Sequence, residues 1–378
     1  MLRDPALCYN FSGSIRERDS ENYTMEFLIY LTKNCNIVCR YCSAKSFIND
    51  LSQNGKEPDV DKTAEFIMKN RGEPGSEVVF FGGEPLLNQK WIKKYMERTS
   101  GCNLKYTIQT NGILLDRLDP FILGNLNYLS LSIDGDRKTT DRGRGQGVYD
   151  ALLANVPKIK PPFRGKMLAR MTLCPENNLY DSVVHLLSLN RFDYVYWQLE
   201  NSPKKILPET VKTKYRAELK KLADQWIDHL KEGKVLPIIP LHEAALSLLG
   251  RKLFRSYRCG AASFQVIIDL DGLCYTCVEL LDPADRIGSI EGEVRQKPIT
   301  AGNFVNFCLK CDILSLCGGR CLMTAVRYPP EKFRFYCDMT RILFETVGEH
   351  LPNLKKILQG NLLTLQDLIC DFSTEEIP

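Results

Sequence analysis

The chain has 378 residues and a formal net charge of +4, and its Lys and Arg residues are interspersed with Asp and Glu, which does not indicate a nucleic-acid partner. No apolar run approaches the roughly 20 residues that a membrane-spanning helix needs, and the charged N-terminal stretch lacks the apolar core of a signal peptide. We therefore expect the 15 cysteines in a reducing cytoplasm, where metal binding or catalysis is a better interpretation than disulfide bonding.

From Thr24 onward, short apolar runs alternate with amphipathic stretches, as in parallel βαβ units. The strands are predicted over Met25–Leu31, Glu77–Phe81, Leu104–Gln109, Tyr128–Ile133, Lys166–Leu173 and Tyr194–Leu199. The helices between them are predicted over Val60–Asn70, Gln89–Thr99, Val148–Val156 and Leu179–Leu189. This order predicts an α/β fold: a partial (β/α)6 barrel of the TIM type, followed by a small cysteine-rich domain.

The rest of the chain has a different character. Pro208–Glu232 is predicted to be a long charged helix, glycine turns and dense cysteine spacing begin near Cys259, and Glu345–Phe372 is expected to be largely helical. The expected divisions are an N-terminal segment (1–23), the barrel (24–240), the cysteine-rich domain (241–345) and a C-terminal helical segment (346–378).

Polar residues follow the ends of the predicted strands. Three cysteines follow the first strand, Gly82-Gly83 follows the second, and Asn111, Asp134 and Gln198 stand at the ends of later ones. In barrels of βα units, the C-terminal ends of the strands form the active-site face. We therefore expect these residues around one mouth.

The three cysteines, Cys35, Cys39 and Cys42, have the spacing C-x3-C-x2-C. Three thiolates can hold three irons of a four-iron cluster and leave the fourth iron open to a small ligand. A structural zinc site would require four protein ligands, so the spacing favours a catalytic cluster.

The stretch Gly82-Gly83-Glu84-Pro85 lies between a predicted strand and a predicted helix. Two glycines would let a ligand approach the backbone closely, and Glu84 could accept a hydrogen bond from an ammonium group. An ordinary turn is the alternative for this segment taken alone.

Together these motifs resemble the radical S-adenosylmethionine (SAM) enzymes. The resemblance implies that the open iron chelates SAM, and that reduction cleaves SAM to methionine and a 5′-deoxyadenosyl radical, which abstracts a substrate hydrogen. It also implies the SAM contacts: Tyr41 over the adenine, Gly82, Gly83, Glu84 and Pro85 at the methionyl amine, Ser132 at the ribose or methionyl end, and Arg144 (or Arg142 in its place) at the carboxylate.

A second block of cysteines follows the predicted barrel. Its members are Cys259, Cys274, Cys277, Cys308, Cys311, Cys317, Cys321 and Cys337. By spacing alone, eight thiolates could form two four-cysteine cluster sites or two zinc sites.

The block resembles the SPASM extension of radical SAM enzymes, which carries two auxiliary [4Fe–4S] clusters. By that resemblance, Cys259, Cys277 and Cys321 hold the first cluster. Its fourth ligand is Cys274 or is absent, because Leu253 and Phe254 stand where some relatives have a cysteine. The second cluster is then held by Cys308, Cys311, Cys317 and Cys337.

Most SPASM relatives modify peptides or proteins, so we expect an oxidoreductase or maturase that modifies a peptide or protein side chain and receives electrons from a ferredoxin or flavodoxin. The sulfatase-maturing subgroup fits at Gln109 and Asn111, its substrate contacts, but Val278 replaces its acidic base and Ala44 its tyrosine. A shifted carboxylate (Glu279, Asp282 or Asp285) could serve as base. The alternatives are a small-molecule or cofactor-precursor substrate, or a non-catalytic iron–sulfur or zinc protein.

Overall fold

The fold is described by a computed structural model. The expected N-terminal segment lies outside the described residues, as do Ala44 and Leu253. The described residues are 25–42, 55–71, 76–159, 162–201, 207–252, 254, 257–294, 308–370 and 378.

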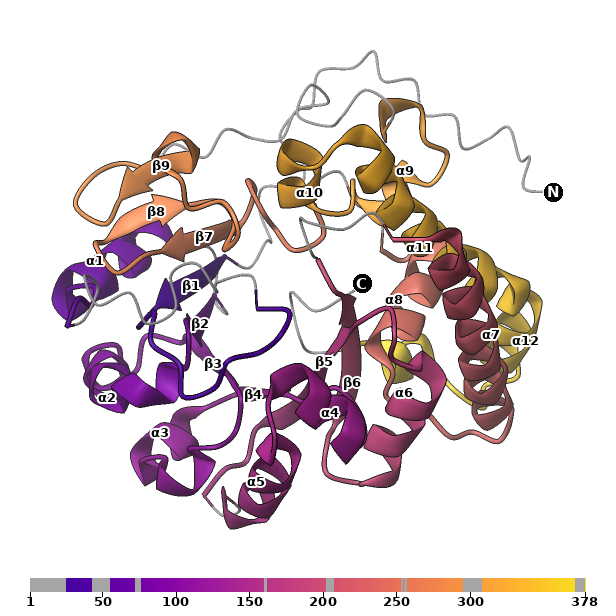
Figure 1. Cartoon of the computed structure of the whole chain (residues 1–378), viewed down its shortest axis with the longest axis horizontal. Coiled ribbons are helices and arrows are strands. Elements are labelled where there is room, and N and C mark those ends of the chain that lie inside the picture. Colours follow the sequence, from indigo (N-terminus) through magenta and orange to yellow (C-terminus); the bar gives the residue numbers. More distant parts are fainter. Residues whose placement is uncertain are drawn as a thin grey trace.

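Six parallel strands form the barrel wall (Figure 1). They are β1 (Glu26–Tyr30), β2 (Glu77–Phe81), β3 (Lys105–Thr110), β4 (Tyr128–Ser132), β5 (Lys166–Leu173) and β6 (Tyr194–Leu199). Each strand pairs in parallel with the next one in the chain, so their order in the sheet is their order in sequence. The predicted partial barrel is confirmed.

Helices cover the outer face of this wall. They are α1 (Val60–Asn70), α2 (Gln89–Arg98), α3 (Pro120–Asn125), α4 (Arg137–Arg144), α5 (Val148–Asn155) and α6 (Leu179–Ser188). Asp59, Asp119, Asp136 and Asn178 each accept a backbone hydrogen bond at the start of a helix, which satisfies an otherwise unpaired N–H.

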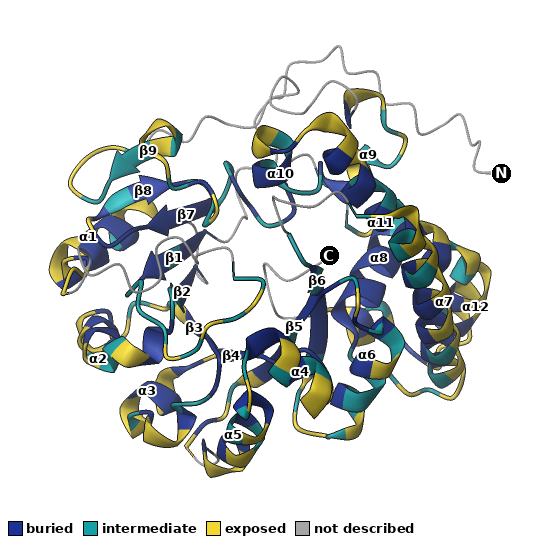
Figure 2. Cartoon of the chain, in the orientation of Figure 1, coloured by how far each residue is buried: buried dark blue, intermediate teal, exposed yellow. Residues whose placement is uncertain are grey.

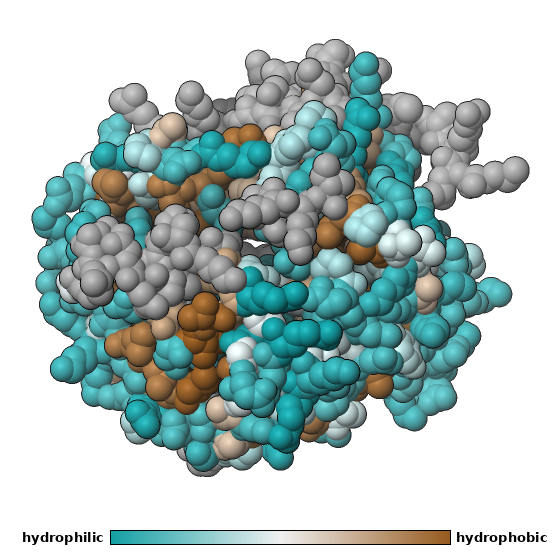
Figure 3. Space-filling model, viewed as in Figure 1, coloured by the Kyte–Doolittle hydropathy of each residue, from teal (hydrophilic) through white to brown (hydrophobic). Residues whose placement is uncertain are grey.

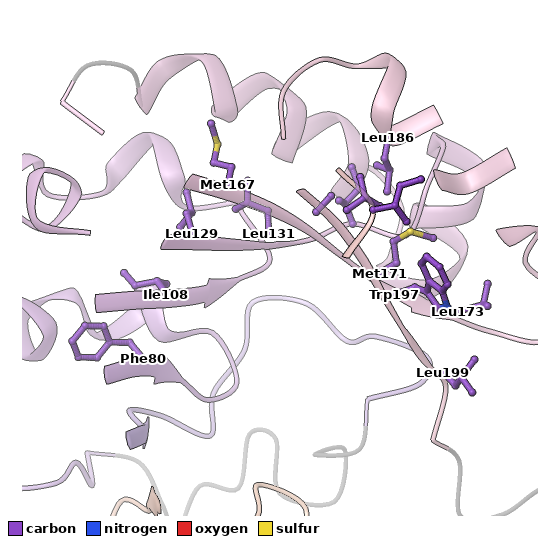
Figure 4. Close-up of a cluster of buried hydrophobic side chains, with 14 of the residues drawn as sticks. Phe80, Ile108, Leu129, Leu131, Met167, Met171, Leu173, Leu186, Trp197 and Leu199 are labelled. Atoms are coloured by element: carbon purple, nitrogen blue, oxygen red, sulfur yellow. The ribbon is translucent and has the colours of Figure 1, made fainter. Parts of the chain in front are cut away.

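The main core lies between the strands and these helices. Figure 4 shows Phe80, Ile108, Leu129, Met171 and Trp197 from successive strands, together with Leu186 of α6. The strands are largely buried, while the outward helix faces are exposed (Figure 2). Because these strands are parallel, their C-terminal ends meet at one edge of the wall, which is the position of the mouth.

The cysteine-rich region is continuous with the barrel sheet. β7 (Gln265–Ile268) pairs in parallel with β1, and β8 (Leu273–Tyr275) and β9 (Arg286–Ser289) extend the edge in antiparallel fashion. In the described residues the sheet therefore has nine strands in one row. Cys259, which precedes β7, and Cys277, which follows β8, are thus close in sequence to strands of the sheet that contains β1.

The remaining helices follow β6 in the chain and extend from its side of the barrel toward the β7–β9 strands (Figure 1). They are α7 (Glu209–Lys231), α8 (Ile239–Leu248), α9 (Leu314–Cys317), α10 (Leu322–Arg327), α11 (Pro330–Glu349) and α12 (Leu351–Gln359). The expected boundary at 345/346 falls inside α11, because its buried apolar residues continue from Phe333 to Val347. Among the described residues no helix has the length and apolarity to cross a bilayer, and the face in Figure 3 is mostly hydrophilic.

Candidate active site

The segment that carries Cys35 rests on the double glycine after β2. Gly83 N–H donates to Thr32 O (2.8 Å) and Glu84 N–H donates to Asn34 O (2.9 Å). A Cβ atom at Gly82 would lie 2.5 Å from Thr32 O, and one at Gly83 would overlap the Asn34 carbonyl. The close approach expected from a ligand is made here by the protein's own backbone, so the glycines position the segment before the first cysteine.

Glu84 is completely buried, and its carboxylate points into the protein. Oε1 accepts from Leu86 N–H (3.1 Å) and the Thr110 hydroxyl (2.7 Å), and Oε2 accepts from Asn111 N–H (2.9 Å). Burial raises its pKa to about 7 despite these three hydrogen bonds. The side chain expected to bind an ammonium group instead connects the ends of β2 and β3, which leaves only the backbone of this motif for a ligand.

Asn111 and Gln109 were expected to contact substrate. Asn111 is buried, and its amide Nδ2 donates to Asn36 Oδ1 (2.7 Å) and approaches Cys35 Sγ at 3.9 Å. The structure therefore joins Asn111 to the cysteine segment. Gln109 is half-buried on β3, next to Ser130 of β4 in register.

Asp134 links three parts of the mouth. It is fully buried at the end of β4, accepts from the Tyr41 hydroxyl, and pairs with Arg144 through Oδ1 (2.7 Å), which also accepts from Thr172 N–H (2.9 Å). The guanidinium of Arg144 lies 5.4 Å from the centre of the Tyr41 ring. Burial lowers the pKa of Arg144, but Asp134, Tyr41 and Cys39 together raise it above its ordinary value, so the side chain stays charged.

Arg144 and Tyr41 therefore already have protein partners where the resemblance implies SAM contacts. The buried Nε of Arg144 has no hydrogen-bond partner among the described residues, so one donor is left for an acceptor. Ser132 is buried at the end of β4, opposite Arg170. Arg142 donates to Asn177 (3.2 Å).

The three motif cysteines lie within electrostatic range of each other. Burial, with smaller contributions from Glu84, Cys39 and Cys42, raises the pKa of Cys35 to about 11, although a hydrogen bond from the Ile37 backbone opposes this rise. Burial also raises the pKa of Cys39, while the adjacent Arg144 counteracts it. Such a half-buried set of thiols beside a guanidinium fits an anionic iron–sulfur cluster.

The C-terminal cysteines fall into two sets. Burial raises the pKa of Cys277, and Cys321 and Cys259 raise it further, so these three lie together. Burial likewise raises the pKa of Cys337 to about 12, with added contributions from Cys317, Cys308 and Cys311. In the described ranges no three His, Cys, Asp or Glu side chains surround a single ion. The thiolates around a four-iron cluster bind different irons, so they need not converge on one point.

Cys274 is not part of the first set. It is fully buried in β8, beside Ile268 and Gly288, and the nearby charge that acts on its pKa is Arg286. The structure therefore leaves that set with three cysteines.

Sequence reasoning missed Arg320 and Tyr257. Gly318, Gly319 and Arg320 have successive φ values of 67°, 81° and 64°, and the backbone N–H of Arg320 binds the Cys317 thiol. Tyr257 is fully buried beside cysteines of both sets, Cys308 and Cys321 among them. The Gly-Gly pair before Arg320 was the available signal for the tight turn.

Of the three candidate bases, Asp282 and Asp285 both pair with Arg327 on the surface. Glu279 follows Cys277 closely, and its backbone N–H donates to Cys277 Sγ (3.5 Å). Its carboxylate also raises the pKa of Tyr30, after the larger effect of burial.

Comparisons with known proteins agree with this geometry. Residues 29–187 match the family model of the radical SAM superfamily. The chain contains a radical SAM domain. This domain includes the three-cysteine motif in the barrel mouth and the buried hydrogen bonds that hold the motif in place.

The similarity extends beyond this domain. The cysteine-type anaerobic sulfatase-maturating enzyme of Clostridium novyi (strain NT) is 24% identical over 366 residues, covering 86% of this chain and 96% of that enzyme. The structure of anSMEcpe with bound AdoMet superposes with a TM-score of 0.72 at 20% identity, covering 92% of this chain and 98% of that chain. SuiB of Streptococcus suis bound to the precursor peptide SuiA gives a TM-score of 0.57 at 18% identity, covering 79% and 72%. These superpositions show a shared fold.

Proposed function

We propose that the chain is a radical SAM enzyme that modifies a peptide or protein side chain by hydrogen abstraction. The observation that carries the proposal is the three-cysteine set at the mouth of a parallel barrel, beside a buried arginine with a free N–H. The chain is similar to a sulfatase-maturating enzyme along nearly the full length of that enzyme, which favours a peptide or protein substrate over a small molecule.

In this proposal Cys35, Cys39 and Cys42 hold the catalytic [4Fe–4S] cluster, which together with SAM supplies a substrate-oxidising radical. The backbone of Gly82–Pro85, the free Nε of Arg144 and the Ser132 hydroxyl bind the methionyl end of SAM. Tyr41, held by Asp134, borders the adenine side. The buried hydrogen bonds of Asp134 and Glu84 orient the groups that bind SAM and exclude water from the mouth.

The two C-terminal sets hold auxiliary clusters in the same proposal. Cys308, Cys311, Cys317 and Cys337 supply four ligands to one cluster, while Cys259, Cys277 and Cys321 supply three to the other. Tyr30 of β1 is near both Cys277 and Cys42, which raise its pKa after the larger effect of burial, so the mouth and the three-cysteine auxiliary set approach the same side chain. This arrangement supports transfer of an electron from the substrate region to the auxiliary clusters. A cytoplasmic ferredoxin or flavodoxin is the proposed donor.

The first test combines metal analysis with SAM cleavage. Anaerobically reconstituted protein should contain about 12 irons per chain with matching sulfide and little zinc. With reductant it should convert SAM to methionine and 5′-deoxyadenosine. About 4 irons with about 2 zincs would instead indicate that the C-terminal sets are structural zinc sites. Iron-loaded, reduced protein that leaves SAM intact would overturn the enzymatic proposal and favour a non-catalytic iron–sulfur protein.

The second test concerns the substrate. Peptides from a library should be incubated with the reduced enzyme and SAM, and deuterium transfer from labelled peptide into 5′-deoxyadenosine should be measured by mass spectrometry. Transfer from a peptide side chain supports the proposal. Transfer only from small cofactor precursors would replace it with the small-molecule alternative.

A further inference from the structure

The side chain of Asn111 is held in one orientation beside Cys35. Its Oδ1 accepts from Ile113 N–H (3.0 Å), as in an Asx turn. Since Oδ1 is the acceptor, Nδ2 carries the two N–H groups on the opposite side. Those groups face Asn36 Oδ1 (2.7 Å) and Cys35 Sγ (3.9 Å). The amide therefore presents a donor to the thiol.

The backbone of Asn111 is fixed as firmly as its side chain. Its N–H donates to Glu84 Oε2 (2.9 Å), and the neighbouring Thr110 hydroxyl donates to Glu84 Oε1 (2.7 Å). Glu84 N–H in turn donates to Asn34 O, one residue before Cys35. Asn111 and Cys35 thus belong to one closed ring of hydrogen bonds, which is buried at Glu84 and Asn111 and partly exposed at Asn34 and Cys35. Such a ring leaves little freedom for Asn111 to turn toward a substrate.

The two neighbouring cluster thiols are supported by different donors. Arg144, a cation, lies beside Cys39, whereas Cys35 accepts from two neutral groups, the backbone N–H of Ile37 and the amide of Asn111 (3.9 Å). N–H groups directed at cluster sulfurs stabilise the reduced, more negative state and so raise the reduction potential. Removal of such a donor makes the cluster harder to reduce.

We propose that Asn111 is a positioning residue for the radical cluster: it orients Cys35 and raises the reduction potential through its N–H, and it does not bind substrate. The inference rests on the part of the proposed function in which Cys35, Cys39 and Cys42 hold a cluster. It replaces the expectation that Asn111 contacts the substrate.

The test is a potentiometric titration of the full-length reconstituted protein, followed by electron paramagnetic resonance. In Asn111→Ala the ratio of reduced to oxidised cluster at a fixed potential should fall about tenfold, which corresponds to about 59 mV for one electron. Asn111→Ser keeps a short donor and should recover part of this loss. Asn125→Ala removes an exposed amide on α3 that donates to Phe121 O (2.8 Å), and it should titrate like the wild type.

A further variant separates the donor from the fold. Asn111→Asp keeps the acceptor for Ile113 N–H but replaces the amide donor with a negative charge, so its ratio should fall by more than that of Asn111→Ala. Iron content is measured for every variant, and the comparison uses those that retain the cluster. Wild-type potentials in Asn111→Ala and Asn111→Asp would overturn the inference. So would a rise in the KM for peptide without any change in potential.

Failure of the inference can be distinguished from failure of the proposed function. The cluster signal of the wild type should change when SAM is added. If it does not, the proposed function fails before any variant is compared. If it does, and all Asn111 variants titrate like the wild type, only the role of Asn111 is refuted.

Discussion

The barrel mouth and the C-terminal region hold their cysteines in different ways. At the mouth, three cysteines within eight residues lie on one segment, which is tied to the ends of three neighbouring strands through Gly83, Glu84 and Asp134. In the C-terminal region the cysteines extend from Cys259 to Cys337 and come from loops, short helices and α11. The first site is therefore determined by the sheet, whereas the second depends on helices packing together.

A buried charged side chain stabilises the C-terminal region, whereas hydrogen bonds to strand ends hold the barrel mouth. Arg258, next to Cys259, is buried with its guanidinium 3.8 Å from the Phe254 ring centre and 3.6 Å from Glu243 of α8. Its Nε also donates to Leu316 O, beside Cys317 (3.0 Å). The two cysteine sets of this region thus share one buried cation, so a single defect there should disturb both.

The largest contrast is expected from removing one cysteine in each region. Cys39→Ala should abolish SAM cleavage because the catalytic cluster loses a ligand. Cys337→Ala should retain SAM cleavage but lose peptide modification, since only the second auxiliary cluster is affected. Both are measured by 5′-deoxyadenosine release and peptide mass, with iron content as control. Loss of SAM cleavage in Cys337→Ala would show that the two regions depend on one another.

The next effect concerns the support of the mouth. In Gly83→Ala the new methyl group would overlap the Asn34 carbonyl and displace the cysteine segment, so SAM cleavage should fall about a hundredfold. Gly250→Ala is the matched control: this glycine has a φ of +72° but open space around it. It should cost about 1 kcal/mol of stability and leave SAM cleavage unchanged. Equal activity of the two variants would contradict the proposed support.

Removing the buried carboxylate of Glu243 tests how much buried charge stabilises the C-terminal region. Glu243→Gln should lower the free energy of unfolding by about 3 kcal/mol, because the buried Arg258 and the adjacent Lys252 would lose the negative charge of Glu243. Iron should be lost from the auxiliary sets before the catalytic cluster. Glu349→Gln removes an exposed partner of Lys220 and should cost less than about 1 kcal/mol. Denaturant unfolding under anaerobic conditions measures both, and similar losses would refute the importance of burial here.

The sequence predicts the barrel well because each strand is a short apolar run that ends in a polar turn. β2, β5 and β6 have the predicted bounds. Only the C-terminal end of the long helix α11, from Glu345, was predicted, since the rest of it lies among the cysteines and resembles the loop-rich region around it. The sequence could group Cys274 with Cys277 by proximity, but the direction of β8 buries Cys274 in the core.

The sequence predicted several residues of the mouth, but it predicted few of the contacts between their side chains. Asn111, Asp134 and the Gly-Gly pair lie at the mouth because strand ends converge there. Which side chain pairs with which could not be predicted, since Glu84 and Asn111 are 27 residues apart and meet only after β2 and β3 align. Some of the residues that the resemblance assigns to SAM binding already contact other protein side chains, as Arg144 pairs with Asp134.

The smallest expected effect is on acid stability, through α8. His242 is buried on this helix, with Nε2 2.9 Å from Leu236 O, and burial lowers its pKa from 6.5 to about 4. As the pH falls below 6.5, the unfolded chain binds a proton that the folded chain does not accept until about pH 4, so stability is lost across this window. Between pH 7 and pH 5 the contribution of His242 to stability should fall by about 2 kcal/mol, while Glu84, whose buried carboxyl has a pKa raised to about 7, stabilises the mouth as the pH falls through the same window.

His242→Gln lacks the titrating group, so its stability should decline less between pH 7 and pH 5 than that of the wild type, as measured by urea unfolding. α8 also carries Glu243, the partner of Arg258. Acid should therefore loosen the C-terminal region before the mouth, and the auxiliary cluster signals should decay before the SAM-responsive one. Equal pH slopes for the wild type and the variant would show that His242 does not control this loss.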